Sequence, residues 1–87
     1  MHAVVTKVSI TDLDTATTNL RERTAPAVSQ LPGFVAGYFT RLGDDALSMV
    51  VFDSEENAKS ASETVSSRIP EGVSLESVEV REVLASA

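Results

Sequence analysis

The residues able to do chemistry are few in this chain, and they form no familiar catalytic set. Tyr38 offers a phenol that can donate a hydrogen bond, and Arg41 offers a guanidinium that can bind a carboxylate or a phenolate. Asn19 can orient a ligand through its amide. Each also has a structural interpretation: a core tyrosine with its hydroxyl at the rim, a solvated or subunit-bridging arginine, and an asparagine beside an apolar helix stripe. We expect Tyr38, Arg41 and Asn19, with Phe34 and Phe52, to line any substrate-binding site.

The other polar residues carry weaker signals. His2 is the only histidine and can act as a general base, although its position favours a mobile terminal side chain. Asp44 and Asp45 fit a turn better than a metal site, because no third carboxylate follows at suitable spacing. The absence of cysteine excludes disulfides and thiolate chemistry, and no Ser-His-Asp set or phosphate-binding glycine loop is present. Catalytic residues therefore stay unassigned, and we expect no metal and no cofactor.

Composition indicates one globular domain spanning residues 1–87. The formal net charge of -6 disfavours nucleic acid and anionic membranes as partners, because phosphate binding needs clustered Lys and Arg and the seven here are scattered. The sequence has neither a leader-like N-terminus nor an apolar run of the ~20 residues that a spanning helix needs. We expect a soluble protein of the cytoplasm.

The first half of the chain predicts a strand followed by a helix. Residues 2–10 are rich in β-branched side chains, which is typical of a strand. Thr11 is a good N-cap for a helix whose apolar residues recur every three to four positions as far as Leu31. Pro26 removes a backbone donor, so it should kink this helix or split it into a long piece and a short turn.

The stretch from Pro32 to Asp53 predicts a hairpin of two strands that turn at residues 43–45. Both strands are apolar on both faces, with Phe34, Ala36 and Tyr38 expected on one side of the first. A sheet with one solvated face should alternate apolar and polar residues, so this hairpin needs a cover on each side. Two, three or four residues fit the loop equally well.

The second half predicts a helix and a final strand. Asp53 or Ser54 can cap a helix that ends at Pro70, and residues 73–84 form a long strand with a bulge near Glu76 and Ser77. The order β-α-β-β-α-β is the ferredoxin-like pattern of an α+β fold: a four-stranded antiparallel sheet with both helices on one face. Because two helices cover one face only, we expect a homodimer that packs sheet face against sheet face, with the extra length of the last strand pairing with the partner's edge.

Segments of the chain resemble the antibiotic-biosynthesis-monooxygenase-like family of dimeric α+β barrels. The resemblance lies in LPGFVAGYF after a helix and in LSMVVFDSEENAKSASETV after the turn, and it spans nearly the whole chain in element order. It implies a pocket between the sheet and the helices of each subunit. In enzymatic members it implies oxygenation of aromatic compounds without metal or flavin, or breakdown of haem. The chain lacks the strand Asn, the Trp and the helix His that haem-degrading members share.

Two functional hypotheses follow. In the first, the protein is a cofactor-independent monooxygenase acting on an aromatic or phenolic small molecule, whose anion Tyr38 or Arg41 stabilises. In the second, it is a non-catalytic dimer that binds a small apolar ligand or has a structural role. The pocket distinguishes the two: a closed cavity above ~300 Å³ with an inward polar group favours chemistry. A space filled by Phe34, Phe39 and Phe52 favours the second hypothesis.

Overall fold

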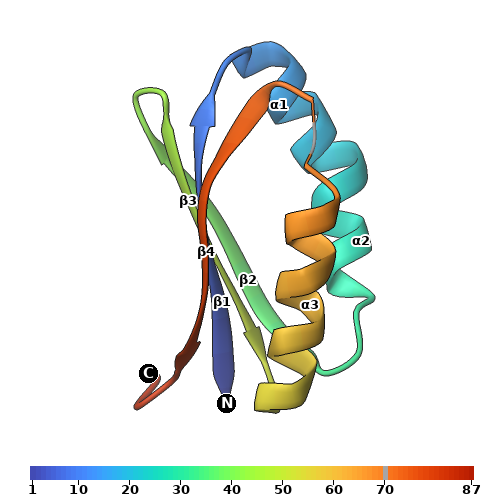
Figure 1. Cartoon of the computed structure of the whole chain (residues 1–87), viewed down its shortest axis with the longest axis vertical. Coiled ribbons are helices and arrows are strands. Elements are labelled where there is room, and N and C mark those ends of the chain that lie inside the picture. The colour runs from blue at the N-terminus through green and yellow to red at the C-terminus, as the bar shows by residue number, and fades with distance from the viewer. Residues whose placement is uncertain (70) are drawn as a thin grey trace.

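Four antiparallel strands form one sheet, and helices cover one of its faces, in the computed structural model, which describes residues 1–69 and 71–87 (Figure 1). The strands lie side by side in the order β2-β3-β1-β4. The predicted α+β class and four-stranded antiparallel sheet are confirmed, and the arrangement is compatible with a ferredoxin-like topology. The elements in chain order are β1 (His2–Ile10), α1 (Leu13–Asn19), the π-helical turn η1 (Leu20–Thr24), α2 (Ala25–Ser29), β2 (Phe34–Leu42), β3 (Asp45–Phe52), α3 (Glu55–Ser67) and β4 (Val73–Glu82).

Strand β1 is central and pairs with both β3 and β4. Val4 lies between Val50 and Val80, and its own side chain is buried. The register of β4 shifts at Glu76, which leaves that residue without a partner on β1 and confirms the predicted bulge. The bulge accounts for the length of β4, since its ten residues lie opposite the nine of β1. The strand ends at Glu82, two residues before the predicted end.

The N-cap of α1 is Asp12, which corrects the expectation that Thr11 is the cap. The Asp12 side chain accepts a hydrogen bond from the Thr15 N–H at 3.2 Å, and its backbone is extended. The N–H groups of Thr11 and Asp12 both donate to the Gly72 carbonyl, at 2.8 and 3.1 Å. These bonds hold Thr11 in the connection from β1, so the next residue begins the helix.

Pro26 splits the first helix as predicted, and the split takes the form of a π-helical turn. The Ala25 N–H donates to the Leu20 carbonyl five residues earlier, and α2 then continues to Ser29. In an α-helix the proline ring would meet the carbonyl of Glu22, four residues before it. The wider turn avoids that contact, and the chain stays helical through the proline.

The β2–β3 loop has two residues, Gly43 and Asp44, so the shortest of the three open alternatives is correct. Gly43 has φ 62°, as the first central residue of a type II′ turn requires. A register shift between Phe34 and Ala36 places a bulge at Val35. The bulge turns Phe34 to the helix-covered face with Gly37 and Phe39, whereas we expected Phe34 to share a face with Ala36 and Tyr38.

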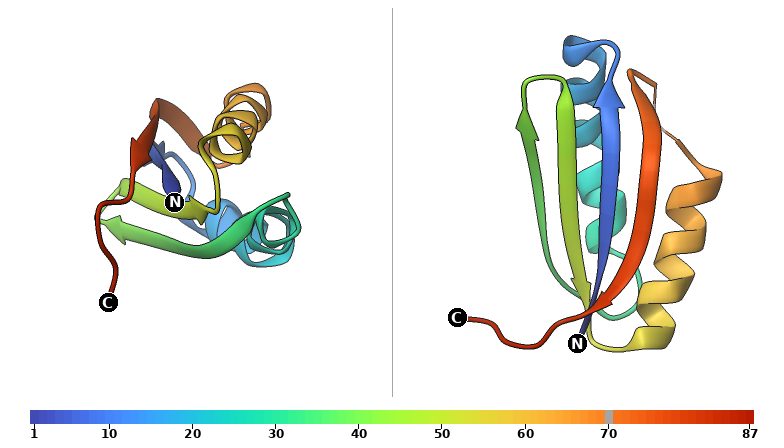
Figure 2. Two further views of the ribbon diagram at one scale, coloured as in Figure 1. Left: turned by 90° about the horizontal axis from the view of Figure 1, so that it is seen from below. Right: turned by 60° about the vertical axis from the view of Figure 1, so that its left-hand side comes forward.

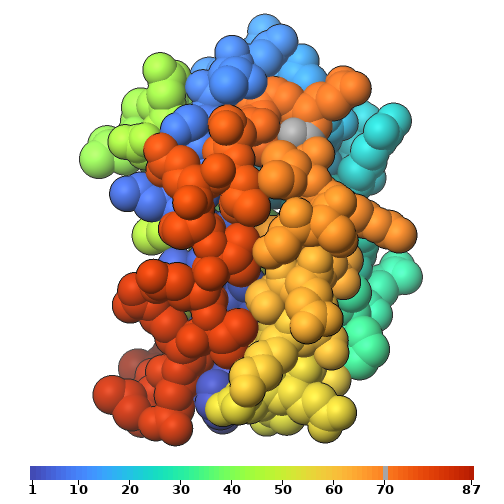
Figure 3. All heavy atoms as spheres, viewed as in Figure 1, coloured from blue at the N-terminus to red at the C-terminus, as the bar shows by residue number. Residues whose placement is uncertain are grey.

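Helix α3 lies against the sheet beside β4 (Figure 3). Its N-cap is Ser54, whose side chain accepts a hydrogen bond from the Asn57 N–H at 3.2 Å. Ala58 and Ala61 are buried against the core of Val4, Val50 and Phe52. Alanine at these positions lets the helix backbone approach the strands closely.

The other face of the sheet carries no helix, and Figure 2 turns it toward the viewer. We call it the open face. Its large apolar side chains on β2 and β3 are exposed: Tyr38, Leu42, Leu47 and Met49. The covered and open faces of the same two strands are therefore both apolar, as predicted.

Candidate functional site

The interior between the sheet and the helices is filled by aromatic rings. The Phe34 and Phe52 rings meet edge to face, with centroids 6.5 Å apart, and Phe52 is only 1% exposed. Gly37 has no side chain between the Phe34 and Phe39 rings, and a Cβ there would lie 3.4 Å from Phe34 and 3.6 Å from Phe39. These rings occupy the space in which the sequence predicted a pocket.

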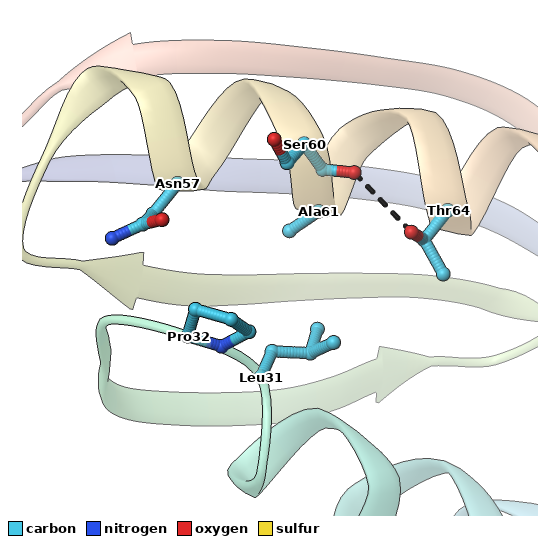
Figure 4. Close-up of a pocket in the computed structure, with 6 residues that line it drawn as sticks. All are labelled: Leu31, Pro32, Asn57, Ser60, Ala61 and Thr64. Atoms are coloured by element: carbon cyan, nitrogen blue, oxygen red, sulfur yellow. Dashed lines mark hydrogen bonds between the residues drawn. The ribbon is translucent and has the colours of Figure 1, made fainter.

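A cleft remains at one edge of this interior, between the α2–β2 connection and α3 (Figure 4). Its volume is about 180 Å³. Leu31 and Pro32 form one wall, and the other wall is a single stripe of α3 made of Asn57, Ser60, Ala61 and Thr64. These residues lie at the i, i+3, i+4 and i+7 spacing that one helix face requires. The cleft is open to solvent, and three of its six lining residues are apolar.

The polar groups of the cleft are largely engaged within the fold. The Thr64 hydroxyl donates to the Ser60 carbonyl at 3.2 Å, and the Asn57 Nδ2 donates to Asp53 Oδ1 at 2.9 Å. The carboxylate accepts only, so this bond fixes the orientation of the Asn57 amide. Neither a carboxylate nor an imidazole lines the cleft. The cleft therefore offers no acid or base.

Gly33 sets the distance between the cleft walls. Its backbone has φ 79°, and its carbonyl accepts a hydrogen bond from the Asp53 N–H at 2.9 Å. A Cβ at Gly33 would collide with the Asn57 amide and the Asp53 carboxylate. A residue without a side chain is therefore needed where the α2–β2 connection meets the start of α3.

Tyr38 and Arg41 lie outside the cleft. Tyr38 is on the open face, opposite Met49, and it is 66% exposed. Arg41 lies near the end of β2 and donates from Nη1 to the Gly43 carbonyl at 3.0 Å, which ties it to the hairpin turn. The structure therefore separates these two side chains from Phe34 and Phe52.

Asn19 lines a second hollow, of about 390 Å³, together with Arg23, Thr24 and Glu71. Its Nδ2 donates to the Glu71 carbonyl at 3.3 Å, which ties the end of α1 to the turn before β4. This hollow is polar and lies away from the aromatic interior. Of the five sequence-predicted site residues, only Phe34 and Phe52 are in contact.

His2 is held in β1 rather than mobile, which corrects the expectation for it. Its Nε2 lies 3.2 Å from Glu55 Oε2, and Lys59 Nζ lies 2.8 Å from Glu55 Oε1. The hydrogen bond from Lys59 lowers the pKa of Glu55, and the charges of Lys59 and His2 add to this effect. The same pair raises the pKa of Lys59. This network joins the start of β1 to the first turns of α3.

Within residues 1–69 and 71–87, no group of three or more His, Asp or Glu side chains is placed to hold a metal ion. No helix in the same residues combines the length and the apolar character needed to cross a membrane.

Sequence reasoning missed the cleft walls, because the signal there is weak. The stripe Asn57, Ser60, Ala61 and Thr64 follows helical spacing, yet three of its members are polar and resemble a solvated helix face. Searches with protein-family models gave no match to the chain, and no curated protein matches it. The interpretation of the site therefore depends on its geometry.

Proposed function

We propose that this protein is a subunit of a homodimeric α+β barrel that binds a small apolar molecule in the cleft and does not convert it. The observation that carries this proposal is the filled interior. Phe34, Phe39 and Phe52 leave a cleft of about 180 Å³ with no acid or base in its walls. Chemistry on a ligand there would have to proceed without a general acid or base among the lining side chains.

The size of the cleft supports a ligand of one ring. An enclosed, dry apolar cavity of about 150 Å³ in another protein binds benzene. The recess at Leu31, Pro32 and Ala61 has a similar volume but is open to solvent, so its volume sets an upper limit of about one ring on the occupant. Binding sites for larger molecules span about 300–1,000 Å³. The ligand class supported best is therefore a single-ring or short-chain apolar compound.

The exposed surface supports the dimer. The chain exposes 5765 Å², which is about 850 Å² more than the roughly 4,900 Å² expected for a monomer of 9.2 kDa. Part of the excess comes from the tail that follows Glu82, and the apolar open face contributes the kind of surface that partners bury. A standard interface covers about 800 Å² on each partner.

Titration of the protein with toluene and indole, followed by amide chemical shifts, tests the binding proposal. We expect saturable shifts at Leu31, Ala61 and Thr64. Ser60→Phe fills the cleft from an exposed position and should abolish them, whereas Ser66→Phe makes the same change on α3 outside the cleft and should not. Binding that Ser60→Phe leaves intact would refute the cleft as the site.

Oxygenation of a phenol is the second candidate, and the position of Tyr38 favours it. In a dimer closed through the open faces, the Tyr38 phenol would become enclosed and could donate a hydrogen bond to a substrate anion. A phenol and O₂ would give a para-quinone and water, with the phenol supplying all four electrons. Oxygen uptake with a panel of phenols and hydroquinones, and its loss in Tyr38→Phe, tests this candidate. Arg41→Ala is the control, because Arg41 pairs with Ala46 on the covered face and should not affect uptake at the open face. Uptake no faster than the uncatalysed rate would leave only the binding function.

A further inference from the structure

The open face is divided into rows by the strand register. Two adjacent rows cross the sheet near the start of β1, and each takes one residue from every strand. One row is Ala36, Val51, Ala3 and Arg81. The next row is Tyr38, Met49, Val5 and Glu79.

The rows have the same chemical pattern. In each, the residues from β2, β3 and β1 are apolar, and the residue from β4 is charged. The charges are opposite, and Arg81 Nε donates to Glu79 Oε2 at 2.8 Å within the chain. The two rows together carry no net charge, although the chain as a whole carries -6. This part of the surface therefore adds no net-charge repulsion between two acidic copies.

Consider a two-fold axis that lies between two facing sheets, perpendicular to the strands and midway between the rows. This axis places the first row of one copy over the second row of the other copy. Ala36 then faces the partner's Tyr38, and Val51 faces the partner's Met49. Ala3, which is only 2% exposed in the single chain and so adds little contact area, faces the partner's Val5, and Arg81 faces the partner's Glu79. The small Ala36 opposes the larger, 66% exposed Tyr38, which suits close packing. The strands of the two copies run antiparallel, compatible with aligned sheets packed about 10 Å apart at an angle within about 30°.

We propose that a second copy of this chain docks on the open face in this register, with Arg81 and Glu79 exchanging partners between the copies. The inference rests on the proposed dimer and specifies how its halves meet. An isologous contact of this kind repeats each pair twice, so both charged residues of both copies are paired. The ion pairs between Arg81 and the partner's Glu79 also disfavour registers that place like charges opposite each other.

Mixing two charge variants tests the register. In Glu79→Arg the β4 margin carries two positive charges, and in Arg81→Glu it carries two negative charges. Both side chains are more than half exposed in the single chain, at 64% for Arg81 and 51% for Glu79, so the fold should tolerate either change. We expect each variant alone to dimerise at least about tenfold more weakly than wild type. The mixture should form the one-to-one heterodimer, resolved from the homodimers by native mass spectrometry.

The double variant Glu79→Arg/Arg81→Glu provides the matched control. It reverses the pair within each chain, and it should dimerise with itself as tightly as wild type does. It should form no heterodimer with wild type, because like charges then meet across the interface. Circular dichroism spectra that match wild type establish that each variant is folded.

The outcomes separate the register from the dimer itself. If the wild-type protein is monomeric, both the proposed dimer and the register are refuted. Wild type that dimerises while the two single variants show no preference for each other refutes the register alone.

Discussion

The two faces of the sheet are similarly apolar, but helices cover one face and solvent covers the other. On β3, Val50 and Phe52 point to the helices and are buried, whereas Leu47 and Met49 point the other way and are exposed. The contrast shows that both faces of these strands are apolar, and that the helices of the chain cover one of them. Helix α3 buries the covered face within the chain, whereas Tyr38, Leu42, Leu47 and Met49 on the open face stay exposed.

Phe52→Ala should cause the largest loss of stability, because it removes a ring that is buried among Val4, Ala58 and Phe34. We expect a decrease of about 3–5 kcal/mol in the free energy of unfolding, measured by urea denaturation. Met49→Ala on the open face should cost less than about 1 kcal/mol at concentrations where the protein is dissociated. Equal costs at low concentration would erase the difference between the faces.

Met49→Lys should separate folding from association. A charged side chain in the middle of the apolar rows opposes docking, and we expect the dimer dissociation constant to rise about 100-fold or more. Ser66→Lys adds the same charge on exposed α3 and should leave association unchanged. Size-exclusion chromatography over a dilution series measures both variants. A Met49→Lys protein that elutes as wild type does would show that the open face is not the interface.

Gly33→Ala tests how closely the cleft walls approach on the covered face. The positive φ costs about 1–2 kcal/mol for a residue with a side chain, and the new Cβ also collides with Asn57 and Asp53. Gly43→Ala is the matched control, since its φ is also positive but a Cβ there meets no atom within 4 Å. We expect the first variant to lose at least about 1 kcal/mol more than the second in urea denaturation. Similar losses would mean that the connection moves away from α3 at little cost.

The smallest expected effect is the loss of stability at low pH that comes from Asp12. The backbone N–H of Thr15 lowers the pKa of Asp12 below its ordinary value of 3.8. The folded protein therefore binds this proton less readily than the unfolded chain, so the stabilisation is complete above pH 3.8 and is lost as pH falls through the lower, folded pKa. Asp12→Asn keeps an N-cap acceptor without the titration. The stability of wild type relative to this variant, from urea denaturation, should be greater at pH 7 than at pH 2.5, and a constant difference would contradict the assignment.

Much of the fold could be predicted because local chemistry and tertiary structure agree. The β-branched run from His2 to Ile10 is a strand with those bounds, and the break at Pro26 follows from its missing N–H. The bulge at Glu76 could be predicted because the apolar positions change phase along β4. In each case a single stretch contains both the signal and its cause.

Other features could not be predicted, because their cause lies elsewhere in the chain. Asp12 replaces Thr11 as the cap because the Gly72 carbonyl, 60 residues later, binds both N–H groups. The bulge at Val35 has no phase change of its own, and it reverses the face of Phe34. The site prediction therefore combined Tyr38 with Phe34, and the structure places them on opposite faces.

Sedimentation equilibrium of the wild-type protein, from about 1 to 100 µM, tests the central claim most directly. A second copy covering the open face predicts a mass that approaches twice 9.2 kDa as concentration rises. A mass of 9.2 kDa across the whole range, with Tyr38 and Met49 still exposed to solvent, would contradict it.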